Sequence, residues 1–233
     1  MKNLFLVFTL LIILNPLFGQ DKFIIEGEMN YGTYDHTNIK LFQEELNKVT
    51  GLPTQITDSY PDFYGYRLLL GVLKEKVANN FYFDYRSTGG KISYADYSGK
   101  YGIETLLQAY TLGYEYDYGF IRSKYFSSFL VLRLSGMYND FSFNEYLTVN
   151  EFSENETYFF DSFGASAGAG LKFSFDLKKI IISTSVSYEN NISLYLTWKE
   201  DSKVQFRNLD NKPVDVNWTG MRVGMSLGIP FVM

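Results

Sequence analysis

The segment that most constrains the fold of this chain is the alternating stretch at residues 218–231. Apolar side chains occupy every second position from Met221 to Phe231, while glycine, serine and one arginine occupy the alternate positions from Gly220 to Gly228. Successive side chains of a β-strand point to opposite faces, so the pattern predicts a strand with one oily face and one small, polar face. Larger polar residues would cover the outer face of a water-soluble sandwich. Glycine and serine instead fit the crowded interior of a narrow closed barrel whose oily face is turned to lipid.

The N-terminal end has the features of a secretory signal peptide. Lys2 provides a positive charge, residues 4–14 form an apolar core, and Gly19 is a small residue at a plausible cleavage edge. The core is too short for a transmembrane helix. We therefore expect residues 1–19 to be a cleaved signal peptide and residues 20–233 to form one outer-membrane β-barrel domain.

The composition favours a membrane β-protein and excludes several other classes. Tyrosine, phenylalanine and tryptophan make up 18% of the chain, and no cysteine is present to form a disulfide or carry a lipid. After the predicted signal, no apolar run approaches the roughly 20 residues that a spanning helix needs. The net charge of −5 argues against nucleic-acid binding.

Eight strands are predicted after the signal, each with an oily face and a more polar face. They cover residues 23–31, 63–74, 81–86, 102–118, 126–138, 158–176, 180–198 and 218–231. Long polar connections are expected at residues 32–61, 89–101, 139–157 and 199–216. Short links separate the other strands, and this alternation is typical of barrels with short periplasmic turns and long extracellular loops. The predicted fold class is thus all-β, an eight-stranded antiparallel up-and-down transmembrane barrel.

The first long connection contains a predicted helix over residues 38–49, capped by Thr37 or Asn38 and ended by Gly51. Its apolar face consists of Ile39, Phe42, Leu46 and Val49. Such a short helix needs packing for stability. We therefore expect Phe42 and Leu46 to dock on the aromatic outer rim as a fixed cap, against Tyr31, Tyr60, Phe63 and Tyr64.

Charged residues also fall on the predicted inward faces of the strands. The acids are Glu26, Glu28, Asp84, Glu115 and Glu189, and the bases are Arg67, Arg86, Arg133, Lys172 and Arg222. Unpaired charges in so narrow a space are costly, so these side chains should pair across the lumen. The expected result is a structural network that plugs the barrel. The alternative is a gated ion path.

The one histidine, His36, follows the first predicted strand. We interpret it as a solvated loop residue. The alternative is a catalytic set with Asp96 and Ser98 of the second connection. Without cysteine and with a single histidine, the chain lacks the usual ligands of a transition metal. No catalytic, cofactor or metal site is predicted.

The signal, the tyrosine-rich alternating strands and the loop pattern together resemble the small eight-stranded outer-membrane barrels of Gram-negative bacteria. That family includes the outer-membrane protein A, outer-membrane protein X and opacity types. Gly19-Gln20 and the helical first loop resemble Bacteroidota members described as PorT-like.

The resemblance implies a non-enzymatic, monomeric protein of the bacterial outer membrane, surrounded by lipid and lipopolysaccharide. It would present four extracellular loops to an envelope or extracellular protein partner. Two alternatives stay open, a narrow porin-like channel for small solutes and an enzyme that modifies lipid A.

Overall fold

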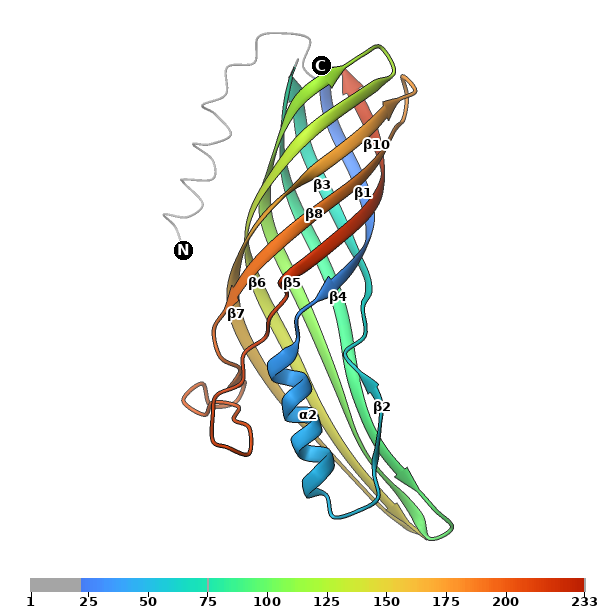
Figure 1. The fold of residues 1–233 in the computed structure, drawn as a ribbon, viewed down its shortest axis with the longest axis vertical. Coiled ribbons are helices and arrows are strands. Elements are labelled where there is room, and N and C mark those ends of the chain that lie inside the picture. Colours follow the sequence, from blue (N-terminus) through green and yellow to red (C-terminus); the bar gives the residue numbers. More distant parts are fainter. Residues whose placement is uncertain (1–21, 75, 233) are drawn as a thin grey trace.

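The computed structural model describes residues 22–74 and 76–232, and within them eight antiparallel strands close into a barrel (Figure 1). These strands are β1 (Lys22–Tyr34), β3 (Phe63–Lys74), β4 (Val77–Ala95), β5 (Gly99–Arg122), β6 (Phe126–Val149), β7 (Phe152–Asp176), β8 (Ile181–Ser193) and β10 (Gly220–Val232). The ring closes because β1 pairs with both β3 and β10. The predicted fold class is confirmed. The predicted signal peptide lies outside the described residues.

Apolar side chains cover the outside of the ring. In β10, Met225 and Leu227 are 64% and 62% exposed, whereas Ser226 between them is 5% exposed. The same alternation runs through β3, where Leu68 and Leu70 face outward and Arg67 faces inward. A ring that leaves no strand edge unpaired satisfies its own backbone hydrogen bonds, which is the condition for crossing hydrocarbon. The barrel therefore presents its oily surface to a lipid bilayer.

Within the described residues, no helix is long and apolar enough to cross a membrane.

Four consecutive strands continue far beyond one end of the ring. β5 and β6 have 24 residues each and β7 has 25, whereas a tilted membrane strand needs about 9–11. The predictions of polar loops at residues 89–101 and 139–157 are wrong, because strand pairing continues through both. In each case the polar side chains misled the prediction. Outside the membrane, polar side chains can face water while the paired strands satisfy the backbone hydrogen bonds.

The two hairpins of this extension end in tight turns. In the first turn, the Asp96 carboxylate accepts hydrogen bonds from the backbone N–H groups of Ser98 and Gly99. In the second, Asn150 adopts a left-handed backbone conformation with φ +53°, which asparagine tolerates better than most residues. Two short strands widen the projecting sheet. They are β2 (Gln55–Ser59), which pairs with β4, and β9 (Thr197–Trp198), which pairs with β7.

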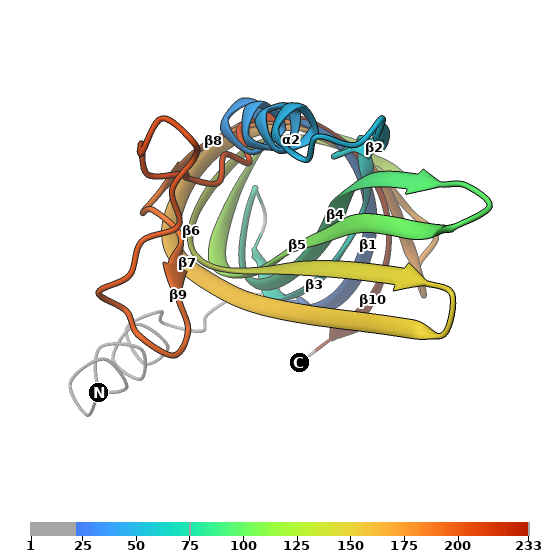
Figure 2. The same cartoon turned by 90° about the horizontal axis from the view of Figure 1, so that it is seen from below.

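The predicted helix is present as α2 (Thr37–Val49) and lies along one side of the open end of the ring (Figure 2). Neither Thr37 nor Asn38 is the cap. His36 holds that position, and Asp35 accepts a 3.1 Å hydrogen bond from the Thr37 N–H. The predicted turn at Gly51 has φ +65°, a conformation that glycine adopts without strain.

The docking surface predicted for α2 is largely wrong. Phe42 packs on Phe206 and Phe143, at ring-centroid distances of 4.6 and 6.4 Å, and not on the outer rim. Tyr31 and Tyr64 pair with each other and are exposed, and the side chain of Phe63 lies outside the described part. Tyr60 does join the cluster that contains Ile39.

The predicted apolar face of α2 is buried only over its first half. Ile39 and Phe42 are buried and Leu46 is half-buried. Val49, which the prediction included, is 63% exposed. It lies in the last turn of the helix, where the cluster under Phe42 no longer covers it.

A cluster of buried apolar side chains sits at the open end of the ring, outside the membrane part. It joins α2 to the inner faces of β5 and β6 and to the connection between β8 and β10. The sequence predicted strand up to residue 198, but β8 ends at Ser193 and the chain then folds over the ring. Leu196 and Trp218 are fully buried there, and the Leu196 N–H donates to the Val214 carbonyl at 3.0 Å. Burial of Leu196 interrupts the ladder with β7, which resumes at β9, where Thr197 and Trp198 pair with Asp161 and Phe160.

Candidate functional site

Two features of the molecule bear on function: the filled interior of the ring and the sheet that projects from its open end. The short links join strands at the end where β1 starts and β10 ends, which is the periplasmic side of an outer-membrane barrel. The projecting sheet and α2 are then extracellular.

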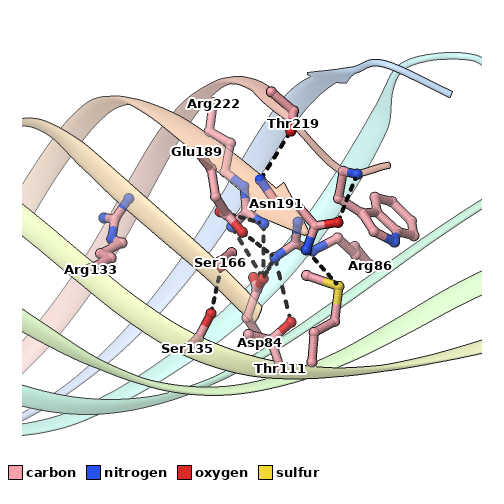
Figure 3. Close-up of polar contacts among 12 residues, drawn as sticks. Asp84, Arg86, Thr111, Arg133, Ser135, Ser166, Glu189, Asn191, Thr219 and Arg222 are labelled. Atoms are coloured by element: carbon pink, nitrogen blue, oxygen red, sulfur yellow. Dashed lines mark hydrogen bonds and ion pairs between the residues drawn. The ribbon is translucent and has the colours of Figure 1, made fainter. Parts of the chain in front are cut away.

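The charged layer nearest the open end is an ion-pair network centred on Asp84 (Figure 3). We call it the upper layer, although Figure 1 draws the open end at the bottom. Asp84 Oδ2 lies 2.8 Å from Arg86 Nη2 and 3.1 Å from both terminal nitrogens of Arg222. Glu189 bridges the same two arginines at 3.1 and 3.0 Å. Arg67 completes the layer, with Glu28 at 2.9 Å and Asp84 at 3.7 Å.

The lower layer lies nearer the periplasmic end and uses different partners. Arg133 Nε donates to Glu115 at 2.5 Å, and Arg133 Nη1 donates to Ser187 at 2.8 Å. Lys172 Nζ contacts three carboxylates, those of Glu26 at 2.9 Å, Asp117 at 3.7 Å and Glu115 at 3.8 Å. Together the two layers leave charged side chains filling the lumen along much of its length.

The structure brings all ten predicted interior charges into these two layers, and none is more than 5% exposed. One further acid, Asp117, belongs to the lower layer and is 2% exposed. Asp117 was absent from the network predicted from the sequence. The sequence could have indicated this residue, because Asp117 comes two residues after Glu115 and both side chains therefore lie on the same face of β5.

Small residues inside the ring make room for these side chains. A Cβ atom added to Gly224 would lie 2.8 Å from the Glu28 carboxyl carbon and 2.8 Å from the Ser185 hydroxyl. At Gly113 it would lie 2.4 Å from the ring of Tyr82. The crowded lumen therefore leaves no room for a side chain at Gly224 of β10 or at Gly113 of β5.

An aromatic layer closes the interior above the charges. The indole of Trp218 donates to Asn139 Oδ1 at 2.9 Å, and Arg86 lies 5.3 Å from its ring centroid. Tyr34 packs edge-on against Trp218 at 5.3 Å. Tyr60 donates to or accepts from Thr105 at 2.7 Å. These rings separate the charged lumen from the extracellular side.

His36 belongs to this aromatic layer, so the interpretation as a solvated loop residue is wrong. Its side chain is 2% exposed and lies 4.8 Å from the Trp218 ring and 6.1 Å from Tyr60. Both ring nitrogens lack a hydrogen-bond partner among the described residues. Burial, with a further contribution from the Lys40 charge, lowers the pKa of His36 from 6.5 to about 3. The imidazole is neutral at pH 7.

The structure does not assemble the alternative catalytic set. Asp96 and Ser98 do contact each other, with a 2.7 Å hydrogen bond, at the tip of the β4–β5 hairpin. His36 packs beside Tyr60, whose backbone N–H donates to the Gly89 carbonyl of β4 at 2.8 Å. Asp96 lies seven residues further along the chain, roughly 23 Å away at about 3.3 Å per residue. The separation rules out a triad in this arrangement.

Among the described strands, the projecting sheet ends in β2 on one side and in β7 on the other, and part of the β7 edge is uncovered. β7 pairs with β8 from Gly164 onward and with β9 at Phe160 and Asp161. In the described part of the chain, residues 152–158 have a partner strand on the β6 side alone, and all seven side chains are exposed. The edge carries Glu154 and Glu156.

Among the described residues, no group of three or more histidine, cysteine, aspartate or glutamate side chains has the arrangement of a metal site.

No protein-family model matches the chain, and no curated protein matches it either. Three solved structures illustrate what the chain is similar to. A major outer membrane protein from Thermus thermophilus is 11% identical, with a TM-score of 0.49 over 91% of this chain and 100% of that chain. Neisserial surface protein A is 11% identical, with a TM-score of 0.44 over 90% and 97%. Ail, the attachment invasion locus protein of Yersinia pestis, is 13% identical, with a TM-score of 0.35 over 91% and 97%. These similarities concern the fold alone.

The molecule's own geometry indicates its place in the membrane. A closed antiparallel ring with an apolar exterior, a charged interior, short turns at one end and long projections at the other is the architecture of an outer-membrane β-barrel.

Proposed function

We propose that this chain is a plugged, monomeric outer-membrane barrel that binds an extended segment of an envelope or extracellular protein partner at the edge of its projecting sheet. The observation that carries the proposal is the uncovered extracellular edge of β7, residues 152–158. A sheet edge with free N–H and C=O groups can accept an added strand, which forms main-chain hydrogen bonds along its length.

The geometry of the edge indicates which groups would bind. The Phe159 carbonyl accepts a hydrogen bond from Lys199 N at 3.0 Å, on the side away from β6. Peptide groups alternate in direction along a strand, so Ser153, Asn155 and Thr157 also direct their N–H and C=O groups away from β6. These three residues would form the ladder with an incoming strand.

The charge of the edge favours a basic partner. Residues 139–157 contain five acids and no lysine or arginine. Glu154 and Glu156 lie on one face, two residues apart, and an added strand would place its own alternate side chains beside them. Edge-to-edge pairing of two copies would bring these glutamates together, which supports a monomer. The expected partner segment carries lysine or arginine at every second position.

The test uses the refolded protein in detergent and a ten-residue synthetic peptide of alternating lysine and valine. Binding should slow amide exchange at Asn155 and Thr157. Asn155→Pro removes an outward N–H without touching the β6 ladder and should weaken binding at least tenfold, whereas Asn155→Ala should bind like the wild type. Equal affinities for the proline and alanine variants would refute the proposal, as would equal binding of a peptide with glutamate in place of lysine.

The filled lumen is the reason that we do not favour the channel. The two charged layers and the aromatic layer above them cross the interior, and an eight-stranded ring is only wide enough for its own side chains. Planar-bilayer recordings should therefore show no steady conductance from the refolded protein. A stable, ion-selective conductance would favour the channel instead.

A further inference from the structure

The interior charges do not balance evenly along the barrel. In the upper layer, three arginines face the carboxylates of Glu28, Asp84 and Glu189. In the lower layer, Arg133 and Lys172 face three acids, Glu26, Glu115 and Asp117. With all three acids ionised, the lower layer holds one more negative charge than positive charges. An uncompensated buried charge is costly, so either a proton on one of these acids or a bound cation must supply one positive charge there.

The excess charge lies beside a cavity. The periplasmic end of the lumen holds a cavity of about 240 Å³, which Glu26, Asp117, Asn80 and Lys172 line at its inner end. Two buried carboxylate oxygens at this end, Glu26 Oε1 and Asp117 Oδ1, have no hydrogen-bond partner among the described residues. The other oxygen of each carboxylate accepts a hydrogen bond. Lys172 donates to Glu26 Oε2, and Asn80 donates to Asp117 Oδ2 at 3.2 Å. Two acceptors and one uncompensated charge therefore meet at one place.

We propose that this cavity binds one small monovalent cation, an alkali ion or a primary ammonium, through the free oxygens of Glu26 and Asp117. A single excess charge matches a monovalent cation. A divalent cation would leave the layer positive by one charge, and among the described residues no three acidic or histidine side chains are arranged to hold a metal ion.

The entrance of the cavity does not prevent access. Lys22 at the rim is paired with Asp176 at 3.1 Å, and Arg122 and Lys124 are exposed to solvent. Exposed charges are screened within about 10 Å at 0.1 M salt, whereas the carboxylates at the inner end are buried. The attraction at the inner end therefore exceeds the repulsion at the rim.

The test compares urea unfolding of the refolded protein in an uncharged detergent, followed by tryptophan fluorescence, at constant ionic strength. Sodium, potassium or methylammonium chloride replaces N-methyl-glucamine chloride, whose large hydroxylated secondary ammonium ion is neither an alkali ion nor a primary ammonium. For the wild type, the unfolding midpoint should rise with the logarithm of the small-cation concentration, because a ligand bound to the native state alone stabilises it.

Asp117→Asn removes the excess charge and should abolish that dependence. In N-methyl-glucamine it should unfold at a higher urea concentration than the wild type. Asp84→Asn is the matched control, because Asp84 is equally buried but belongs to the balanced upper layer. It should unfold at lower urea in every salt and keep the cation dependence.

A wild-type midpoint that is independent of the small cation would overturn the proposal and leave a proton on Asp117 as the compensating charge. A dependence that persists in Asp117→Asn would overturn it as well, because the cation would then bind elsewhere.

Discussion

Replacing Asp84 with asparagine should be among the most destabilising single changes in the lumen. Asp84 is fully buried and lies within 3.1 Å of Arg86 and Arg222, with Arg67 at 3.7 Å. The change preserves shape but leaves three guanidinium groups facing the two carboxylates of Glu28 and Glu189. Removing one partner from a buried, hydrogen-bonded ion pair typically costs about 3–5 kcal/mol, so we expect a loss of that size.

The assay is equilibrium urea unfolding in uncharged detergent, followed by tryptophan fluorescence. Trp218 is a suitable reporter because it is fully buried and Arg86 lies 5.3 Å from its ring centroid. Thr111→Val is the matched control. The Thr111 hydroxyl is also fully buried, but it accepts a single long hydrogen bond of 3.5 Å from Arg86, so its loss should cost about 1 kcal/mol or less.

A second variant tests the origin of the effect. Asp84→Asn combined with Arg222→Gln restores the charge balance of the upper layer and should recover part of the lost stability. A cost for Asp84→Asn no larger than that of Thr111→Val would refute the prediction. That result would mean that water screens the interior charges and that they do not form a plug.

The burial of particular side chains leads to three further predictions. His36 has a pKa of about 3 when folded and 6.5 when unfolded, so as the pH falls through 6.5 the unfolded chain takes up a proton at His36 that the folded protein does not. The free energy of unfolding should fall by about 2 kcal/mol between pH 7 and pH 5, and His36→Phe should remove that part of the decrease in urea titrations. Ala167 faces lipid, so Ala167→Arg should cost about 2–4 kcal/mol, while the inward Ser166→Ala should cost about 1 kcal/mol by losing its bond to Ser135; equal costs would mean that the lipid-facing register is wrong. Amides of residues 41–46 should be protected from hydrogen exchange in the wild type and exchange fast in Phe42→Ala, because Phe42 holds α2 on Phe206; fast exchange in the wild type would show that the helix is not docked.

The sequence alone determined the membrane part of the fold. Alternation along β10 and β7 distinguished the lipid-facing from the interior side chains, because a strand has a period of two whatever its neighbours are. The same parity placed Glu115 and Arg133 inside the ring. The same alternation also places Asp117 inside the ring, although the predicted network omitted this residue.

The tertiary structure decided what happens outside the membrane. Residues 89–101 and 139–157 look like loops because they are polar, yet they are strands because β4, β5, β6 and β7 pair with one another beyond the ring. Pairing of this kind depends on neighbouring strands and leaves little trace in the local sequence.

The partners of individual side chains were also set by tertiary structure. His36 follows a strand in a polar connection, but Trp218, from the other end of the chain, covers it. Phe42 could have packed on any nearby aromatic surface, and Phe206 reaches it because the connection after β8 folds over the ring. Periodicity indicates which face of an element is buried. What lies against that face depends on contacts between residues far apart in sequence, and these arise only when the ring closes.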